Sequence, residues 1–306
     1  MRIVSLLPSA TEILFALGAG PDVVGVSHEC DFPPAAAGLP VLTRPCVPTD
    51  GRSPAQIDRD VSDLVAGGHP VYDIDRPLLR RLAPDLIVTQ ALCEVCAVGS
   101  GDVHRVVHEQ QLGARVLTLT PLDLEGVFVS IDEVGAAIGR PDAARALTDP
   151  LRDEVRSLRE RPAGGARPRV LALEWTDPPF VAGHWVTEQI DAAGGVDVLG
   201  APRRASFRTT WDDIAAARPD VIAVIPCGYT LAEIVEQAAD LEAQPAWRDL
   251  LAVRAGRVWA LDAGAWFSRP GPRLVEGVRA LAAILADPDA PAGPAGTRRL
   301  PAPALA

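Results

Sequence analysis

The sequence has 306 residues, 48% of them hydrophobic, and a formal net charge of −11 at pH 7. Because domains usually contain ~100–200 residues, this length and composition predict two domains, each with its own hydrophobic core. Electrostatic binding of nucleic acid needs clustered Lys and Arg side chains that release counterions from the phosphates. The acidic balance therefore argues against nucleic acid as a partner.

The first residues do not have the pattern of a secretory leader, which needs a basic start, an apolar run of about 7–15 residues and a cleavage site. A strand-like run begins instead at Ile3, and a helix follows from Pro8. No later stretch reaches the ~20 apolar residues of a membrane span. We therefore expect a cytoplasmic protein without membrane insertion, and a periplasmic or extracellular one only if the true start lies upstream.

Short runs of Val, Ile and Leu alternate with helical stretches along the chain, which is the pattern of parallel βαβ units. In the first helix, Ser9 and Glu12 have the spacing of a capping box, and Gly18 ends the helix. The predicted strands are residues 3–7, 23–27, 86–89 and 115–119 in the first half, and 169–173, 220–225 and 257–261 in the second half.

Apolar positions recur at helical spacing from Leu124 to about Arg161. Gly139-Arg140-Pro141 interrupts them, so either one long helix bends there or two helices meet. The pattern predicts an α/β fold with two βα lobes, parallel central sheets and a long helical connector. The expected limits are residues 1–121 for the N-terminal βα lobe, 122–162 for the connector, 163–287 for the C-terminal βα lobe and 288–306 for a disordered Pro/Ala tail.

Rare side chains gather directly after five of the predicted strands. Ligands of open α/β sheets bind outside the carboxyl ends of the strands, so these residues are candidates for a binding site. The histidines could instead only hydrogen-bond a turn, and the aromatic side chains could be ordinary core. The candidate ligand-binding residues are His28, Glu29, Gln90, Glu174, Trp175, Phe180, His184, Trp185, Cys227, Tyr229, Trp266, Phe267 and Arg269.

Five cysteines, an odd number in a large chain, are typical of reduced thiols rather than of a disulfide framework. Cys93-x-x-Cys96 has a spacing that can hold a soft metal, and Cys30 with His28 could complete the shell. This hypothesis predicts a site for Zn, Fe or an iron–sulfur cluster. A redox dithiol and the plain packing of buried thiols are the alternatives.

The motifs of common enzyme classes are missing from the sequence. It contains no G-x-S-x-G elbow, no P-loop and no G-x-G-x-x-G dinucleotide turn. We therefore predict no catalytic residue and a protein that is not an enzyme, and leave open a third hypothesis in which the thiols or Glu174 act on a bound small molecule.

Several segments, in this order, carry a resemblance to one family: residues 5–13 (Ser-Leu-Leu-Pro-Ser-Ala-Thr-Glu-Ile), 84–87 (Pro-Asp-Leu-Ile), 194–195 (Gly-Gly), 218–222 (Arg-Pro-Asp-Val-Ile) and 269–273 (Arg-Pro-Gly-Pro-Arg). The chain resembles the helical-backbone (class III) substrate-binding proteins of ABC importers for cobalamin, iron-siderophore complexes and haem. It is most similar to the cobalamin-binding branch, and the resemblance extends to about residue 286.

The resemblance implies a shallow ligand cleft between two lobes and a corrinoid, cobalamin or a related metal chelate, as the ligand. The cobalt could accept a His or thiolate axial ligand, and the ring amides could bond Gln90, Glu174 or Arg269. An ABC importer permease is the implied partner if the chain is exported. The alternatives are a cytosolic metal-ion or iron–sulfur protein that uses Cys30, Cys93 and Cys96, and a thiol-dependent enzyme on the same scaffold.

Overall fold

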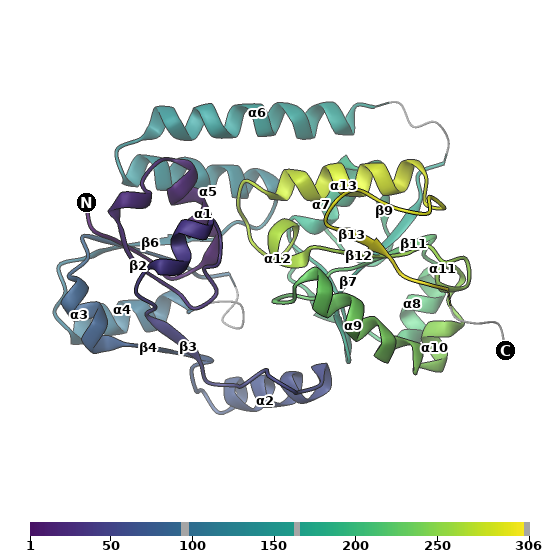
Figure 1. Ribbon diagram of the computed structural model, residues 1–306, viewed down its shortest axis with the longest axis horizontal. Helices are drawn as coiled ribbons and strands as arrows, with labels where there is room; N and C mark the ends of the chain where they lie inside the picture. The colour runs from purple at the N-terminus through teal and green to yellow at the C-terminus, as the bar shows by residue number, and fades with distance from the viewer. Residues whose placement is uncertain (93–97, 162–165, 303–306) are drawn as a thin grey trace. The chain divides into compact units, whose positions relative to one another are not determined.

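The computed structural model describes residues 1–92, 98–161 and 166–302 (Figure 1). The chain forms two compact units. Unit 1 contains residues 1–121 and 125–150, and unit 2 contains residues 122–124 and 151–306. Each unit has its own central sheet and its own buried core.

Unit 1 is built on a four-stranded parallel sheet in the order β2-β1-β5-β6. Ile3, Val4 and Ile87 have no exposed surface, so the two central strands form the middle of the core. All four strands predicted in the first half of the chain are confirmed, because buried parallel strands are continuous apolar runs. The strands are β1 (Ile3–Ser5), β2 (Val23–Val26), β5 (Leu86–Gln90) and β6 (Arg115–Leu119).

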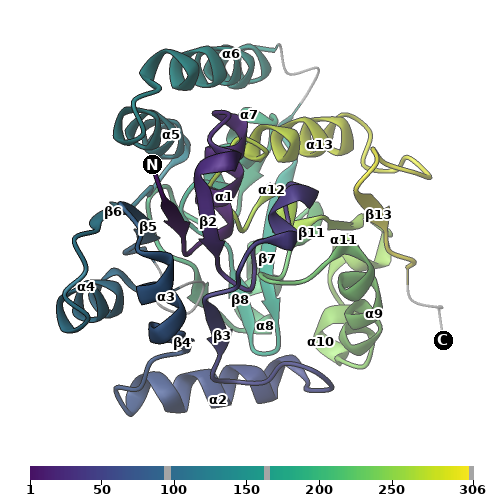
Figure 2. The same ribbon diagram turned by 60° about the vertical axis from the view of Figure 1, so that its left-hand side comes forward.

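A short antiparallel pair, β3 (Thr43–Pro45) and β4 (Tyr72–Ile74), lies outside this sheet and was not predicted. In both ribbon views it lies between the sheet and α2 (Figures 1 and 2). The helices that precede β6 in the chain are α1 (Pro8–Ala16), α2 (Pro54–Ala66), α3 (Arg76–Leu82) and α4 (Ser100–Glu109), with 3₁₀ turns η1 (Gly20–Asp22) and η2 (Pro34–Gly38).

The predicted capping box of the first helix is wrong. Leu7 is the N-cap and makes no side-chain cap. Pro8 is the first helical residue, so Ser9 is the second residue of the helix and cannot be its N-cap. Proline suits this first position because its missing N–H would have no partner there in any case. The predicted end is confirmed, since Gly18 follows the helix with a φ of 73°.

Two helices, not one bent helix, follow β6. α5 (Leu124–Ala137) and α6 (Pro141–Arg159) meet at Gly139, whose φ is 73°. They pack closely, because a Cβ on Gly135 would clash with the Cβ of Ala144. The division between the units falls inside α6, whereas a separate connector was predicted at residues 122–162; these domain limits stay a prediction.

Unit 2 contains a seven-stranded sheet in the order β10-β8-β7-β11-β12-β13, with β9 paired to β7. The central strands β7, β11 and β12 are parallel and confirm the three strands predicted in this half. The outer strands of the sheet, β8 and β10 on one side and β13 on the other, are antiparallel to their neighbours and were not predicted. The strands are β7 (Arg169–Thr176), β8 (Pro179–Val181), β9 (Val196–Asp197), β10 (Phe207–Arg208), β11 (Val221–Val224), β12 (Val258–Leu261) and β13 (Thr297–Arg299).

A buried amide ties three helices of unit 2 together. Gln189 has no exposed surface, and its Nε2 donates to the carbonyl oxygens of Trp266 and Leu274, each at 2.9 Å. These bonds connect α7, α12 and α13. The helices of this unit are α7 (Val186–Ala192), α8 (Trp211–Ala217), α9 (Leu231–Glu242), α10 (Pro245–Arg248), α11 (Leu251–Arg254), α12 (Ala263–Trp266) and α13 (Leu274–Ala286).

The predicted disorder from residue 288 onwards is wrong for the part that the structure describes, residues 288–302. β13 pairs with β12, and Leu300 is 6% exposed. The guanidinium of Arg299 donates to the carbonyl oxygens of Gly256 and Asp289 at 2.7 and 2.6 Å. Composition misled here because two- and three-residue edge strands need few apolar side chains when a partner strand supplies the backbone bonds.

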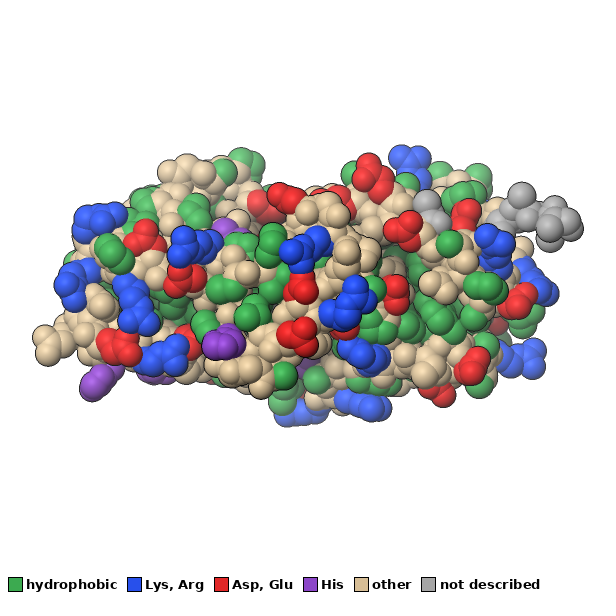
Figure 3. Space-filling model, turned by 90° about the horizontal axis from the view of Figure 1, so that it is seen from below, with side chains coloured by type: hydrophobic (Ala, Val, Ile, Leu, Met, Phe, Trp, Pro, Cys, Tyr) green, Lys and Arg blue, Asp and Glu red, His purple; other side chains and the backbone are tan. Residues whose placement is uncertain are grey.

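The described helices include none with the length and apolar character needed to cross a membrane. On the face seen in Figure 3, acidic and basic side chains are interspersed with hydrophobic ones.

Candidate functional site

The first group of candidate residues lies in unit 1, where β1 and β2 end and the β3–β4 pair begins. A small, narrow hollow lies there. Its position at the carboxyl ends of parallel strands is the one expected for ligand sites in α/β sheets. The lining residues are Leu6, Ser27, His28, Glu29, Thr43, Tyr72 and Val98.

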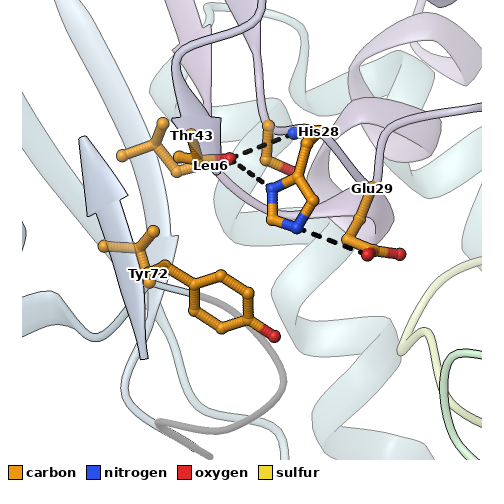
Figure 4. A pocket seen from close by; sticks show the side chains of 7 residues that line it. Leu6, His28, Glu29, Thr43 and Tyr72 are labelled. Carbon is orange, nitrogen blue, oxygen red and sulfur yellow. Dashed lines mark hydrogen bonds and ion pairs between the residues drawn. The ribbon is translucent and has the colours of Figure 1, made fainter. Parts of the chain in front are cut away.

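The His28 ring is held from one side by Thr43. The Thr43 hydroxyl accepts the backbone N–H of His28 at 3.0 Å and lies 2.7 Å from the ring Nδ1 (Figure 4). The other ring nitrogen, Nε2, lies 3.4 Å from a carboxylate oxygen of Glu29. A histidine fixed through Nδ1 presents Nε2 in a defined direction, which is the usual arrangement of metal-binding histidines.

Burial lowers the pKa of His28 below its usual 6.5, and the negative charge of Glu29 opposes this only in part. The imidazole is therefore neutral at pH 7, which is the form that binds a metal. The Tyr72 ring lies 5.3 Å from the His28 ring, centroid to centroid, at an angle of 44°. Figure 4 shows the two side chains next to each other, the phenol end of Tyr72 being directed away from its strand.

The other sequence candidates of unit 1 are less accessible. Gln90 is buried at the end of β5. Cys30, two residues after His28 in the sequence, is buried as well. The Cys30 sulfur lies 3.0 Å from the Thr11 hydroxyl and 3.2 Å from the Ser27 hydroxyl. These contacts are those of a thiol packed among hydroxyl groups.

The predicted metal site cannot be traced as a whole, because Cys93 and Cys96 lie outside the described residues. Among the residues that are described, no three His, Cys, Asp or Glu side chains are grouped as a metal site would require. The Cys30 sulfur has the hydroxyl groups of Thr11 and Ser27 as neighbours, and hydroxyl groups are not the usual ligands of a soft metal.

The second group of candidates lies in unit 2, where β7 and β11 end. The backbone N–H of Cys227 donates to the carbonyl oxygen of Glu174 at 3.2 Å and joins the two strand ends. The Trp175 and Tyr229 rings lie 5.5 Å apart at 53°. Burial, the largest effect, raises the pKa of the Tyr229 phenol, so this side chain stays neutral and offers an aromatic face with a hydroxyl.

His184, which follows β8, is held in an unusual backbone conformation. Its φ is 51°, and its N–H donates to the carbonyl oxygen of Arg204 at 2.6 Å. The preceding Gly183 has no space for a side chain, because a Cβ would clash with the backbone of residues 204–206. The His184 ring stacks on Trp185 at 5.5 Å, and burial lowers its pKa below 6.5.

The remaining aromatic candidates differ in how much surface they expose. Trp185 and Phe267 are 5% and 2% exposed, and the Trp185 indole donates to the Phe267 carbonyl oxygen at 2.7 Å. Both side chains therefore have little surface for a ligand. Trp266 is half-buried and donates its indole N–H to Glu276 at 3.2 Å, and Phe180 and Arg269 are also half-buried. Whether these residues contact a ligand stays a prediction.

Sequence reasoning missed Thr43, Tyr72, Arg204, Phe207 and Arg208. The first two belong to the β3–β4 pair, and the others belong to or precede β10. The available signal was weak, namely apolar alternation in Val71-Tyr72-Asp73-Ile74 and the repeated arginines of residues 203–208. Strands of two or three residues are below the length at which alternation is distinctive.

The sequence model of the periplasmic binding protein family matches residues 3–265 of this chain. The chain belongs to this family. The vitamin B12-binding protein of Vibrio cholerae serotype O1 is 26% identical over 289 residues, which cover 93% of this chain and 88% of that protein. A protein of Bacillus subtilis, described as an uncharacterized ABC transporter substrate-binding lipoprotein, is 24% identical. The match covers 92% of this chain and 78% of that protein.

A solved structure gives the same result for the fold. The periplasmic haem-binding protein BhuT, in complex with two haems, superposes with a TM-score of 0.69 at 27% identity. The match covers 94% of this chain and 99% of BhuT. The two-lobed α/β fold and the family resemblance predicted from the sequence are confirmed.

Family membership also bears on the other predictions. The family consists of binding proteins, so neither the thiol-dependent enzyme nor the metal-ion or iron–sulfur protein receives support from the relatives. The predicted cytoplasmic location has no support either, because the relatives are described as periplasmic or as a lipoprotein.

Proposed function

We propose that this periplasmic binding protein binds a metal-containing macrocycle, a corrinoid or a haem, with His28 as the residue that coordinates the metal. The observation that carries the proposal is the geometry of His28: a neutral imidazole, fixed through Nδ1 by Thr43, at the carboxyl end of a parallel strand. Cobalt and iron in such rings accept an axial nitrogen ligand, and a partner that orients the histidine increases its affinity for the metal.

Unit 1 supplies more than the histidine. Tyr72 places an aromatic ring next to His28, and Leu6 and Val98 add apolar side chains to the lining of the hollow. A flat ring with a polar metal centre needs this combination, in which apolar contact covers the ring and a small number of polar groups fix its orientation.

Unit 2 has an aromatic surface of its own. Trp175 and Tyr229 form a tilted pair, and Phe180 follows on β8. Offset and tilted aromatic pairs form rigid apolar surfaces on which a planar ligand stacks with little loss of side-chain entropy. Gln90, Glu174 and Arg269 are the polar side chains that the sequence assigned to the ring edge.

The relatives support a macrocycle rather than another class of small molecule. One relative is a vitamin B12-binding protein, and its match covers almost the whole length of this chain. Another, BhuT, holds two haems. A corrinoid remains the leading ligand, because the sequence is similar to that of a vitamin B12-binding protein over almost the whole chain.

Delivery of this ligand to an ABC importer permease from outside the cytoplasm is part of the proposal. It is supported by the Bacillus subtilis relative, which is described as an ABC transporter substrate-binding lipoprotein. In this view the natural protein is exported or anchored and works next to a permease in the membrane.

The first test is elemental analysis and a visible absorption spectrum of protein purified under anaerobic conditions, followed by titration with cobinamide, cobalamin and haem. We expect saturable binding with a shifted absorption band for at least one of them. His28→Ala should weaken binding about tenfold or more and remove the shift, because the axial ligand is lost.

The matched control is His108→Ala, since His108 is exposed in the last turn of α4 in the same unit. It should bind as the unchanged protein does. The absence of binding for all three macrocycles at high micromolar concentration would reject the proposed function, and unchanged spectra in His28→Ala would reject His28 as the metal ligand.

A further inference from the structure

We propose that unit 1 has a second binding site, which takes the hydrocarbon chain of a free anionic amphiphile such as a fatty acid. The site is an open hollow of about 430 Å³ beside the end of α1. It goes beyond the proposed function, because none of its lining residues lines the hollow at His28. The residues that line this second hollow are Phe15, Gly18, Gly20, Pro21, Ala35 and Leu39.

The second hollow starts at the edge of the sheet opposite to His28. α1 follows β1 and ends before β2, and these two strands are parallel. A helix between parallel strands returns the chain to the amino edge of the sheet. Gly18, Gly20 and Pro21 lie between α1 and the first residues of β2, so they belong to that amino edge, whereas His28 follows the carboxyl end of β2.

The walls of the second hollow offer no hydrogen-bonding side chain, because they consist of glycine backbone and four apolar side chains. The Phe15 ring packs directly on the backbone of Gly20, where a Cβ would lie only 2.7 Å from it. The volume is within the range of about 300–1,000 Å³ that small-molecule pockets have. A hydrocarbon chain suits such walls, since a polar group buried there would lose its hydrogen bonds to water.

The segment that supplies Ala35 and Leu39 adds exposed apolar surface to unit 1. Residues 32–41 include no charged side chain, and Phe32 and Val41 in this segment are 40% and 50% exposed. The segment runs next to the edge strand β2, where Val41 pairs with Val26. Exposed apolar surface that borders a hollow is typical of a binding groove.

A cation stands at the Gly18 end of the second hollow. A Cβ on Gly18 would lie 2.8 Å from Nη1 of Arg140, so the guanidinium lies directly against this wall. Nη1 donates to the carbonyl oxygen of Leu17 at 2.8 Å, whereas Nη2 is 3.7 Å from the Asp22 carboxylate, beyond hydrogen-bond distance. Asp22 also pairs with the amino group of Met1 at 3.3 Å, so two cations share one carboxylate.

This charge selects the head group of the amphiphile. A carboxylate at the end of the hydrocarbon chain would form charge-assisted hydrogen bonds with Arg140 while the chain fills the apolar hollow. A cationic head group would be repelled, and a neutral one would gain less. The combination of apolar walls and a cation at one end therefore favours a fatty acid over other single-chain amphiphiles.

Isothermal titration calorimetry on the full chain tests the proposal with hexanoate, octanoate and decanoate, each below the concentration at which it forms micelles. We expect saturable binding whose affinity rises about threefold to fourfold with each added methylene group, as the chain leaves water. The neutral counterpart is 1-octanol. Octanoate should bind about fivefold or more tightly than 1-octanol, because only the acid gains the bonds to Arg140.

Ala35→Asp is the decisive variant, because it places a negative charge in the wall of the second hollow. It should weaken decanoate binding about tenfold or more. The matched control is Ala37→Asp, which adds the same charge to the same turn, η2, at a position that does not line the hollow. Both alanines are exposed, so the fold accepts either substitution, and the control should bind decanoate as the unchanged protein does.

Arg140→Gln tests the head group separately. It should lower the affinity for octanoate to that for 1-octanol and leave the affinity for 1-octanol unchanged. Arg145→Gln is its control, since Arg145 is exposed on α6 in the same unit and pairs with Asp142 one turn away. It should change neither affinity.

Three results would overturn the proposal. The first is no binding of decanoate at millimolar concentration, and the second is an Ala35→Asp variant that binds decanoate with full affinity. The third is a change of oligomeric state in Ala35→Asp, measured by sedimentation, without an effect on decanoate, which would assign the hollow to a second copy of the chain. Macrocycle binding should be the same in Ala35→Asp as in the unchanged protein, so the proposed function stands or fails independently.

Discussion

His28 follows the parallel strand β2 and His184 follows the antiparallel strand β8, and different contacts hold the two rings. The His28 ring is bonded to Thr43 through a side chain, whereas His184 is held through its backbone N–H and by stacking on Trp185. In both, burial is the main cause of the lowered pKa. Neutral histidines suit a site for metal or ring contacts, and they also make the stability of the protein depend on pH.

The sign of this dependence follows from the proton balance. Between the lowered folded-state pKa and 6.5, the unfolded chain binds a proton at His184 that the folded chain does not. The free energy of unfolding therefore rises with pH across this range and falls on acidification below about pH 6.5. We expect His184→Asn to show a smaller loss of stability than the unchanged protein between about pH 7.5 and about pH 5.5.

Urea denaturation at the two pH values measures the effect. Asparagine is the replacement of choice because it tolerates the left-handed backbone at φ 51° and does not titrate. His104→Asn, on the exposed side of α4, should lose as much stability on acidification as the unchanged protein. A His184→Asn variant with the full loss would show that this histidine is not the responsible group.

At the scale of elements, the short antiparallel strands have structural roles that their length conceals. β13 completes the edge of the unit 2 sheet, and the segment before it packs against indole rings. A Cβ on Gly293 would lie 2.7 Å from the Trp259 ring, and one on Gly296 would clash with Trp266. This close contact explains why glycine stands at both places, and the φ of 81° at Gly296 favours glycine there as well.

Removal of residues 288–306 should therefore destabilise unit 2 and expose both indoles. We expect a lower urea midpoint and a red-shifted tryptophan emission. Leu300→Ala should give part of the effect, up to about 2–5 kcal/mol, because its side chain is buried. Arg298→Ala, exposed on the same strand, is the control and should change neither signal. A truncated chain with unchanged emission would contradict the packing seen here.

At the scale of the whole molecule, two units with separate sheets contribute different chemistry. Unit 1 contains the fixed histidine with Tyr72, and unit 2 contains the tilted pair of Trp175 and Tyr229. A ligand that binds only the folded protein stabilises it in proportion to the logarithm of its concentration. The proposed function therefore predicts a thermal shift.

A macrocycle present at about 100 times its dissociation constant should add about 2.7 kcal/mol to the unfolding free energy. Thermal unfolding followed by far-UV circular dichroism, with and without the ligand, measures the corresponding rise in Tm. His28→Ala at the same ligand concentration should show a smaller rise. A ligand that binds by spectroscopy but leaves Tm unchanged would have to bind the unfolded chain equally well.

The sequence by itself determined seven of the parallel strands, the position of His28 after one of them, and the family. Buried parallel strands are continuous apolar runs, and their ends are recognisable from the polar residues that follow. Only the tertiary structure decided which side chains meet there. Thr43 is 15 residues from His28, and Arg204 is 20 residues from His184, measured along the chain. Both are brought into place by strands of two or three residues whose pairing depends on a distant partner, and local sequence does not encode such pairing.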